Sequence, residues 1–434
     1  MTTIEITDDA SFSAAVSRVC GIGPGAEAEA GLERKLESAR AIVEAVRRRG
    51  DEAVAEFTAQ FDGVVLRPDQ FELSAREIDD AVATVDASLV SVLKRAHANI
   101  REFHSKSLRA SWEETAEDGT ILGQRITPIE RAGVYVPGGK AFYPSSVLMN
   151  IVPASVAGVK EIVMVSPPSH KDGIHPVVLA AARIAGATRI FRIGGAQAIA
   201  ALAYGTECVP SVLKITGPGN VYVALAKRLV SGVCDIDSEA GPSEVVVIAD
   251  AKAEPKFVAA ELVAQAEHDE DARSILVTAS RELAGKVQEE IKRQTVLLPR
   301  KAIIEKSLAG QGMVIVVRDL EEAARITDAI APEHLSIQTE YPRKVFDAIR
   351  NAGAAMLGGM TSVAVGDYYA GPNHILPTGR RARFASPLTA EDFRKVTSII
   401  SYSRERLLKD ADDIIRFAQA EQLTAHANAV EMRR

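Results

Sequence analysis

A repeated order of short apolar strand, glycine-containing turn and helix is the feature that most constrains this fold, and it begins near Ala132. Runs of Val, Ile and Ala alternate with segments whose apolar residues lie three and four positions apart, as on one face of a helix. This alternation predicts parallel sheets that helices cover on both faces. The expected elements are 134–136, 145–157, 161–165, 177–185, 190–193, 195–203, 212–216 and 217–229 in a first series, and 245–248, 255–267, 274–278, 281–293, 314–317 and 320–330 in a second.

The chain is long enough for each series to form its own core. At 434 residues it exceeds what one hydrophobic core usually holds, so two large domains are expected. Before the first series, amphipathic patterns predict helices at 33–49, 51–60 and 75–103, followed by a strand at 122–129. His97 and His104 fall on the third of these segments, and we interpret them as packing or surface residues.

Charge and composition exclude several classes of protein. A formal net charge of −7 and a pI of about 5.8 do not provide the basic surface of a nucleic-acid binder, so no nucleic acid is expected as a partner. No apolar run approaches membrane-spanning length and the N-terminus lacks a signal-peptide pattern, so we expect no membrane partner and a cytoplasmic location. The three cysteines are far apart, which indicates neither a disulfide framework nor a Cys-x-x-Cys metal site.

Polar side chains occur at three strand-to-helix turns of the first series: Tyr135, Gln197 and Asn220. Ligands of open parallel sheets bind beyond the carboxyl ends of the strands, so these side chains are suited to contact a cofactor. Gly217-Pro218-Gly219 is a partial dinucleotide fingerprint with Asp237 twenty residues further on, but the third glycine is missing. The same glycines could serve only to make tight turns, and both interpretations stay open.

The end of the expected helix 255–267 could hold a metal ion. Gln265 and His268 lie three residues apart and should project from one face of the last turn. Histidine is a common zinc ligand, whereas a carboxamide oxygen is unusual, so the alternative is a helix end with a histidine at its negative pole. Four of the eight histidines stand in polar or helix-terminal contexts, and we take these four as the site: His268, His334, His374 and His426.

Two further stretches carry acid and imidazole groups. Pro332 should end a helix and leave Glu333 and His334 in a turn, where they could transfer protons or could simply be a solvated pair. The segment 357–379 is long and irregular, which is typical of functional loops, and within it Asp367 is an anionic candidate ligand near His374.

The last part of the chain turns helical again beyond Pro387. Helices are expected at 391–399 and 410–419, and a short tail follows that contains Glu421 and His426.

Taken together, these motifs resemble those of the L-histidinol dehydrogenase family, over nearly the whole chain. Eight motifs in order are far more specific than any one of them. The matching segments are Arg131 to Gly139, Gly194 to Ala198, Gly217 to Asn220, Ala240 to Glu244, Gln265 to His268, Ala331 to His334, Gly366 to Tyr368 with Asn373-His374, and Leu423 to His426.

This resemblance implies an α/β fold class: two incomplete Rossmann-like domains with parallel sheets, plus two small, mostly helical extensions. Residues 1–25 would be an N-terminal arm, and 26–130 with 244–385 a first large domain that carries the zinc and catalytic residues. Residues 131–243 would be the NAD-binding domain, and 386–434 a helical tail that reaches the partner subunit.

The resemblance also implies residue roles in a homodimer with shared active sites. The expected cofactors are NAD and Zn2+, and the expected substrate is L-histidinol. The roles are zinc ligation by Gln265, His268, Asp367 and, from the partner chain, His426; catalysis by Glu333 and His334; substrate contacts by Ser243, His374 and Glu421 beside the zinc and catalytic residues; and NAD contacts by Tyr135, Gln197 and Asn220.

The implied reaction oxidises histidinol to the aldehyde and then to histidine, the last steps of histidine biosynthesis, with two NAD molecules reduced in succession. His334 would act as general base, and Glu333 would activate the water that hydrates the aldehyde. Gln422 and Arg380-Arg381 depart from the family's usual pattern near the tail and at the mouth of the site.

Other classes of function remain as alternatives. A related zinc- and NAD-dependent dehydrogenase for a different small polyol or amino alcohol would change the contacts carried by Glu421 and His374, both of which are present. A zinc hydrolase would have no use for the three polar turns at the sheet edge, and a non-catalytic binding protein would not need Glu333-His334 beside a metal.

Overall fold

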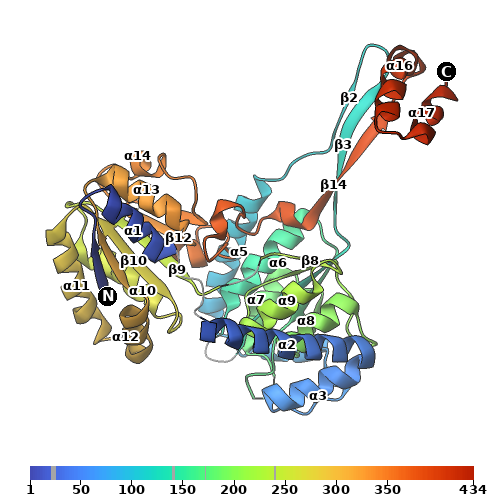
Figure 1. Ribbon diagram of the computed structural model, residues 1–434. Helices are drawn as coiled ribbons and strands as arrows, with labels where there is room; N and C mark the ends of the chain where they lie inside the picture. Colours follow the sequence, from blue (N-terminus) through green and yellow to red (C-terminus); the bar gives the residue numbers. More distant parts are fainter. Residues whose placement is uncertain (21–25, 139–141, 172, 239–240) are drawn as a thin grey trace.

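The computed structural model contains two parallel sheets, each covered by helices on both faces, so the predicted α/β fold class is confirmed (Figure 1). A long arm leaves the two large domains and carries two helices at its tip. The described residues are 1–20, 26–138, 142–171, 173–238 and 241–434. Gly139 and Ala240, which belong to two of the quoted motifs, and residues 21–25 of the expected N-terminal arm lie outside them.

The first large domain is built on a sheet that we call sheet A, with strand order β1-β11-β10-β9-β12-β13 over the described residues, all parallel. Its strands are β1 (Thr2–Glu5), β9 (Glu244–Ala249), β10 (Arg273–Thr278), β11 (Met313–Val316), β12 (His334–Gln338) and β13 (Ala354–Leu357). One face packs on α10 (Pro255–Ala266), α11 (Arg281–Thr295) and α12 (Lys301–Gly310). The other packs on α1 (Asp9–Cys20), α13 (Leu320–Ile330) and α14 (Pro342–Phe346).

The second large domain is built on sheet B, with order β6-β5-β4-β7-β8, again parallel throughout its described strands. Its strands are β4 (Arg131–Tyr135), β5 (Glu161–Val165), β6 (Arg189–Phe191), β7 (Lys214–Thr216) and β8 (Asp235–Ile236). One face packs on α4 (Ala75–Val82), α5 (Ala87–Ser105), α6 (Pro144–Ala157) and α7 (Pro176–Ala185). The other packs on α2 (Ala26–Arg49), α3 (Asp51–Asp62), α8 (Gly195–Tyr204) and α9 (Val221–Val230).

The expected domain boundaries need two corrections. Strand β1 is the edge of sheet A, so the start of the chain is part of the first large domain rather than a separate arm. The helices between 26 and 105, which we assigned with 244–385, pack on sheet B instead: Val43 shares a core with Ile199, and Ile100 shares one with Met149. Apolar periodicity predicts that a helix has a buried face but not which sheet covers that face.

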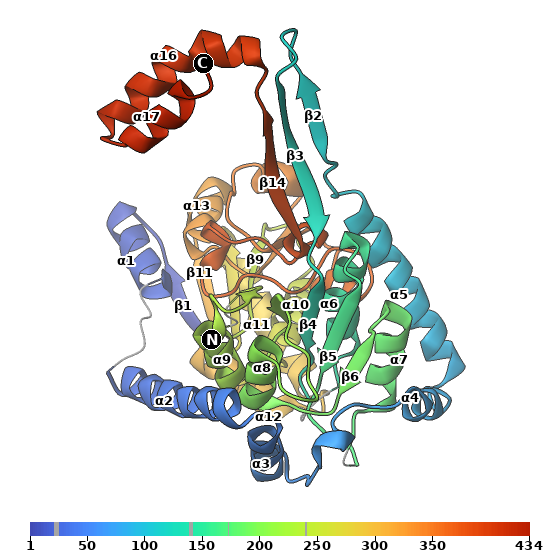
Figure 2. The same ribbon diagram turned by 90° about the vertical axis from the view of Figure 1, so that its right-hand side faces the viewer.

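The arm is an antiparallel sheet in which β3 (Ile121–Pro128) pairs with β2 (Trp112–Thr115) on one side and β14 (Arg394–Ser401) on the other. It carries α16 (Arg404–Ala420) and α17 (Thr424–Glu431) well away from both large domains (Figures 1 and 2). The expected strand 122–129 is confirmed, but the expected helix 391–399 is wrong. Residues 396–400 are rich in β-branched side chains, which fit a pleated surface once β3 supplies a partner.

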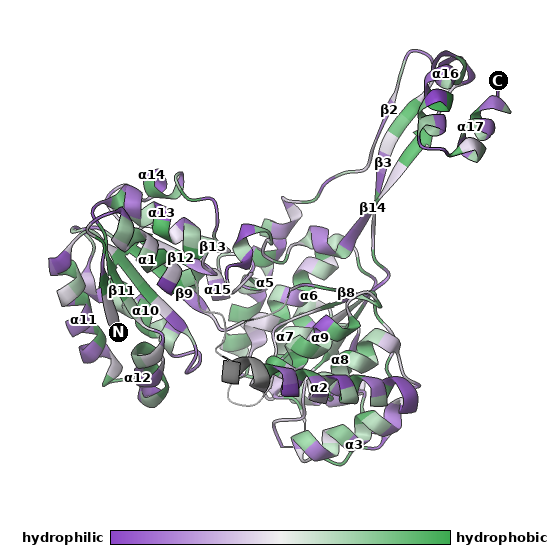
Figure 3. Ribbon diagram, viewed as in Figure 1, coloured by the Kyte–Doolittle hydropathy of each residue, from purple (hydrophilic) through white to green (hydrophobic). Residues whose placement is uncertain are grey.

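The arm strands and tip expose apolar side chains to solvent. Leu122 is 48% exposed, Ile400 70% and Phe417 71%. Figure 3 shows these arm strands with green, hydrophobic segments, although little of the chain covers them. By contrast, the inner strands β9 and β10 of sheet A and β5 of sheet B are buried on both faces.

The remaining short elements are α15 (Val363–Tyr368) and three 3-10 turns at Pro68–Gln70, Arg381–Arg383 and Ala390–Phe393. No helix in the described part of the chain is long and apolar enough to cross a membrane.

Candidate active site

Glu333 and His334 do not lie in a solvated turn, as the sequence suggested, but at the buried start of β12. Helix α13 ends at Ile330, Ala331 adopts the left-handed conformation with φ 51°, and the chain then enters the strand directly. Only 6% of Glu333 and 5% of His334 is exposed. The apolar run that signals β12 is very short, so periodicity alone could not separate it from the loop.

The imidazole of His334 lies between two carboxylates. Its Nε2 is 3.2 Å from Oδ1 of Asp367, and its Nδ1 is 3.7 Å from Oε2 of Glu333. Oε2 of Glu333 also accepts a hydrogen bond of 2.8 Å from the backbone N–H of Glu244, the first residue of β9. The pair is therefore held by the amino end of β9 on the Glu333 side and by Asp367 of α15 (Val363–Tyr368) on the His334 side.

The pKa values of Glu333 and His334 both lie above their usual ranges, but for different reasons. Burial raises the pKa of Glu333, because a carboxylate loses its hydration there, and the nearby imidazole only partly offsets this effect. Burial alone would lower the pKa of His334, but the carboxylates of Glu333 and Asp367 outweigh it and raise that pKa. Such perturbed and coupled groups are typical of proton-transfer sites.

Three predicted zinc ligands come together beside this pair. Gln265 lies in the last turn of α10, is 3% exposed, and its buried Nε2 has no hydrogen-bond partner. The charge of Asp367, in α15, acts on His268 as well as on His334, which places His268 in the same cluster. Oε2 of Glu261 accepts a hydrogen bond of 2.9 Å from the N–H of Val363 and so ties α15 to α10.

His374 connects this cluster to the second large domain. Its Nδ1 is 2.9 Å from the carbonyl oxygen of Asp367, and its Nε2 is 3.3 Å from Oγ of Ser146 in α6. Sequence reasoning did not select Ser146; the signal available was its position in the first turn of a helix that follows the β4 turn. Ser243 lies just before β9, where its carbonyl accepts a hydrogen bond of 2.9 Å from the N–H of Arg273.

The expected cofactor contacts lie at the carboxyl edge of sheet B. Tyr135 ends β4, is 3% exposed, and its hydroxyl accepts a 3.2 Å hydrogen bond from the N–H of Gly195. Burial raises the pKa of Tyr135 to about 12, so its hydroxyl stays protonated. Gln197 is fully buried, and neither polar atom of its side-chain amide has a hydrogen-bond partner. An unpaired buried amide is costly and often marks a ligand-binding position.

The partial dinucleotide fingerprint has a structural role here. Asn220 caps α9, since its Oδ1 accepts hydrogen bonds from two backbone N–H groups of the first turn. Asp237 forms a buried ion pair with Lys227 and accepts a 2.7 Å hydrogen bond from the N–H of Gly217. Its carboxylate is thus already paired within the chain, which favours the structural interpretation of this fingerprint.

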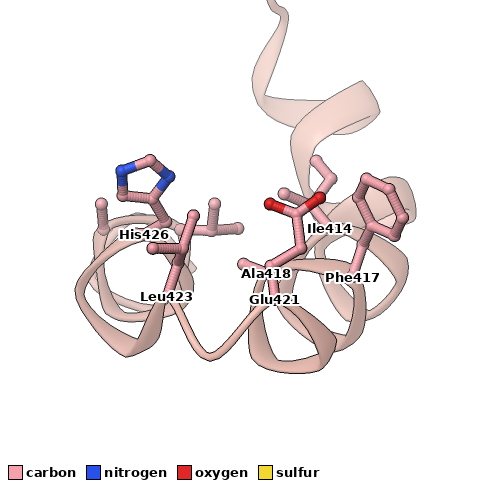
Figure 4. Close-up of a pocket in the computed structure, with 8 residues that line it drawn as sticks. Ile414, Phe417, Ala418, Glu421, Leu423 and His426 are labelled. Carbon is pink, nitrogen blue, oxygen red and sulfur yellow. The ribbon is translucent and has the colours of Figure 1, made fainter.

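Glu421 and His426 lie apart from the other site residues of the same chain. They face a pocket of 370 Å³ between α16 and α17, at the tip of the arm (Figure 4). Apolar side chains of Ile414, Phe417 and Leu423 complete its wall. Within one chain, the tip is far from α10 and β12 (Figures 1 and 2).

The cluster at α10 and α15 fits a metal ion only in part. Among the described residues, no group of three His, Cys, Asp or Glu side chains is arranged to hold a metal. The predicted set supplies only His268 and Asp367 from that class within one chain, with Gln265 as an oxygen donor. A fourth donor must come from elsewhere. The atom of Gln265 that has no hydrogen-bond partner is Nε2, an N–H donor, whereas a metal would bind the side-chain oxygen.

The comparisons with known proteins show the family of this chain. The family model for histidinol dehydrogenase matches residues 26–434. The chain belongs to the histidinol dehydrogenase family. It is 52% identical over 392 residues to the histidinol dehydrogenase of Heliobacterium mobile, covering 90% of this chain and 92% of that one. It is 50% identical over 394 residues to that of Listeria monocytogenes serovar 1/2a, covering 91% and 92%.

A solved structure gives the same result. The crystal structure of histidinol dehydrogenase from Elizabethkingia anophelis superposes with a TM-score of 0.92 at 33% identity and covers 100% of this chain and 98% of that one. Family membership makes this chain an oxidoreductase of histidine biosynthesis.

Proposed function

We propose that this chain oxidises L-histidinol to L-histidine through L-histidinal, with NAD as electron acceptor and zinc as a bound metal. The observation that carries the proposal is the buried Glu333-His334 pair beside Gln265, His268 and Asp367, in a chain of the histidinol dehydrogenase family. A related amino alcohol as substrate is the alternative that the experiment below must exclude.

The catalytic pair divides the proton transfers. The imidazole of His334 takes the alcohol proton during the first oxidation and the proton of the hydrated aldehyde during the second. The carboxylate of Glu333 takes a proton from the water that adds to the aldehyde. Because both groups are buried, released protons leave through the carboxylate–imidazole contacts rather than directly into bulk solvent.

Zinc, held by Gln265, His268 and Asp367 together with His426 of a second copy, would bind the substrate's amine and imidazole nitrogens and orient the reacting carbon. NAD, at the edge of sheet B marked by Tyr135, Gln197 and Asn220, would accept the hydride. Asp367 hydrogen-bonds His334 in the present arrangement. Coordination of Asp367 to zinc would reduce the effect of its negative charge on His334, and would so favour the neutral imidazole that a general base requires.

Substrate contacts from Ser243, His374 and Glu421 would complete the site. His374 is well placed for this role because it touches both large domains. Glu421 faces the same pocket as His426, so one copy's arm tip would deliver an acid and an imidazole together (Figure 4).

We also propose a homodimer, which the exposed surface of the arm supports. The arm exposes apolar side chains that one chain leaves uncovered, among them Ile400 and Phe417. Such surfaces usually mark contacts with another chain. A second copy related by a twofold axis would cover them and bring each arm tip to the other chain's cluster.

Product stoichiometry tests the proposed reaction. We expect about two NADH for each L-histidinol consumed, with no free aldehyde, because both oxidations take place at one site. L-Histidinal supplied alone should give about one NADH. One NADH per histidinol with accumulating aldehyde would make this a simple alcohol dehydrogenase, and faster turnover of another amino alcohol would support the alternative substrate.

A further inference from the structure

A buried carboxylate outside the catalytic pair lies at the centre of the contacts that hold this pair in place. Glu244, the first residue of β9, is 2% exposed. Its Oε2 is 3.3 Å from Nη1 of Arg273, and its Oε1 accepts a 3.1 Å hydrogen bond from the N–H of Gly379. The charge is therefore paired and hydrogen-bonded, as a buried charge must be.

The backbone at this residue lies next to both catalytic residues. The Glu244 N–H donates the 2.8 Å hydrogen bond to Oε2 of Glu333. Val245, the next residue of β9, is the register partner of His334 in β12. The start of β9 thus holds the carboxylate of Glu333 and pairs with the strand that begins at His334.

The turn that binds the Glu244 carboxylate is itself strained. Gly379 and Arg380 both adopt left-handed backbone conformations, with φ of 59° and 66°. In this conformation the turn presents the N–H of Gly379 to the carboxylate of Glu244. A non-glycine residue such as Arg380 resists this conformation, so the turn persists only where other contacts hold it.

Arg273 extends the network to the end of α1. Its Nη2 donates a 3.0 Å hydrogen bond to the carbonyl of Val19, and Nη1 of Arg380 donates one of 3.2 Å to the carbonyl of Cys20. The N–H of Arg273 binds the carbonyl of Ser243, a proposed substrate contact. The carboxylate of Glu244 therefore joins three segments of the chain around one catalytic wall.

We propose that Glu244 is a positioning residue, whose carboxylate, fixed by Arg273 and the Gly379 turn, holds the peptide that aims Glu333 at its water. This inference rests on the proposed function, and specifically on the role of Glu333 in hydrating the aldehyde. Misplacing a catalytic group by a fraction of its hydrogen-bond length reduces the rate of the step in which it acts. Glu244 should thus matter most for the second oxidation.

The test compares the two oxidations in Glu244→Gln and in the double variant Glu244→Leu with Arg273→Met. The first oxidation is followed as the initial NADH formation from L-histidinol, and the second as kcat with L-histidinal. For both variants we expect the second rate to fall by about tenfold or more and the first by about threefold or less, with KM for L-histidinal nearly unchanged.

The double variant separates positioning from stability, because replacing a buried ion pair with apolar residues is often neutral for folding. We expect the Tm of the double variant to lie near the wild-type value, while its second oxidation stays slow. Recovery of that rate together with Tm would overturn the proposal, and so would equal losses in both oxidations. Glu322→Gln is the matched control. Like Glu244, Glu322 is buried, at 3% exposed, and it is paired with an arginine, 2.6 Å from Arg318. This variant should leave both rates unchanged.

Failure of the proposed function is recognised separately. If the wild-type protein formed no histidine from histidinol, the reaction itself would be wrong, whatever the Glu244 variants did. If the wild-type protein completed both oxidations but the variants slowed them equally, only the positioning role would be wrong.

Discussion

The two parallel sheets present opposite edges to the site. In sheet B, Tyr135 ends β4 and Asn220 follows β7, so the expected cofactor contacts lie at the carboxyl edge, where open α/β sheets usually bind ligands. In sheet A, His334 begins β12 and Ser243 precedes β9, so the catalytic side chains lie at the amino edge. His374 connects the two large domains, through the carbonyl oxygen of Asp367 and the hydroxyl of Ser146.

The two edges differ in the backbone and side-chain groups that they provide for binding. The first N–H group of a strand is free at the amino edge, and at β9 the N–H of Glu244 is used to hold the carboxylate of Glu333. The carboxyl edge of sheet B offers helix N-termini and buried neutral groups such as Gln197. The amino edge of sheet A therefore suits anionic catalytic groups, and the carboxyl edge of sheet B suits neutral groups that contact a cofactor.

The largest effects should come from the amino edge of sheet A. His334→Asn should lower kcat by about a hundredfold to ten-thousandfold, because it removes the general base, while the bound zinc is retained. Asp367→Ala should lower both the rate and the zinc content measured by elemental analysis. Loss of zinc from His334→Asn as well would make His334 a ligand instead of a base.

A smaller effect should come from the carboxyl edge of sheet B. Gln197→Leu removes a fully buried amide that has no hydrogen-bond partner, so the free energy of unfolding should rise by about 1 kcal/mol. If the amide forms a hydrogen bond to NAD, the KM for NAD should rise by about tenfold in the same variant, because the loss of that hydrogen bond weakens NAD binding by about this factor.

Gln338→Leu is the matched control, because Gln338 is 3% exposed with an unpartnered Oε1 but lies at the carboxyl end of β12. The KM for NAD should not change there. An unchanged KM in Gln197→Leu would leave that residue with no cofactor role.

The smallest effect concerns a buried acid next to sheet B that the chemistry does not use. Burial raises the pKa of Asp62 from 3.8 to about 6, and its Oδ2 has no partner. The folded state thus binds more protons than the unfolded state between these values, so stability falls as pH rises through this window and the full penalty is present above about pH 6.

Asp62→Asn should therefore stabilise the protein at pH 7.5 by about 1 kcal/mol, after allowance for solvent screening, and should have no effect below pH 3.8. Urea unfolding at both pH values, together with kcat, measures this. A fall in stability at pH 7.5, or a change in kcat beyond about twofold, would contradict the view that this acid serves neither folding nor catalysis.

Much of the fold could be predicted from the sequence because each strand and helix of the two series carries its own apolar pattern. The assignment of α2 to α5 to a domain could not, since amphipathic helices do not specify which sheet they cover. β14 was mistaken for a helix because its apolar spacing is ambiguous without its partner β3. Short β12 and β13 were missed because four or five residues give almost no periodicity.

The roles of the site residues were predicted from their resemblance to the motifs of a family, and not from apolar periodicity or spacing. Histidines in polar contexts pointed to His268, His334 and His374, and the structure brings them together around Asp367. Glu244 and Ser146 were not selected because their importance depends on contacts between segments more than eighty residues apart, such as the 89-residue separation of Glu244 and Glu333. The spacing of Asp237 from Gly217 could not show its ion pair with Lys227, which favours a structural role for the partial fingerprint.

The most direct measurement of the central claim, that an arm tip completes the sheet A cluster of another copy, mixes two inactive homodimers. His334→Asn and His426→Asn proteins should each be inactive alone. After denaturation and remixing in equal amounts, half of the dimers are mixed and each has one intact site, so about a quarter of wild-type activity should return. No recovery, with subunit exchange verified by mass spectrometry of tagged chains, would mean that His426 does not complete the site of a second copy.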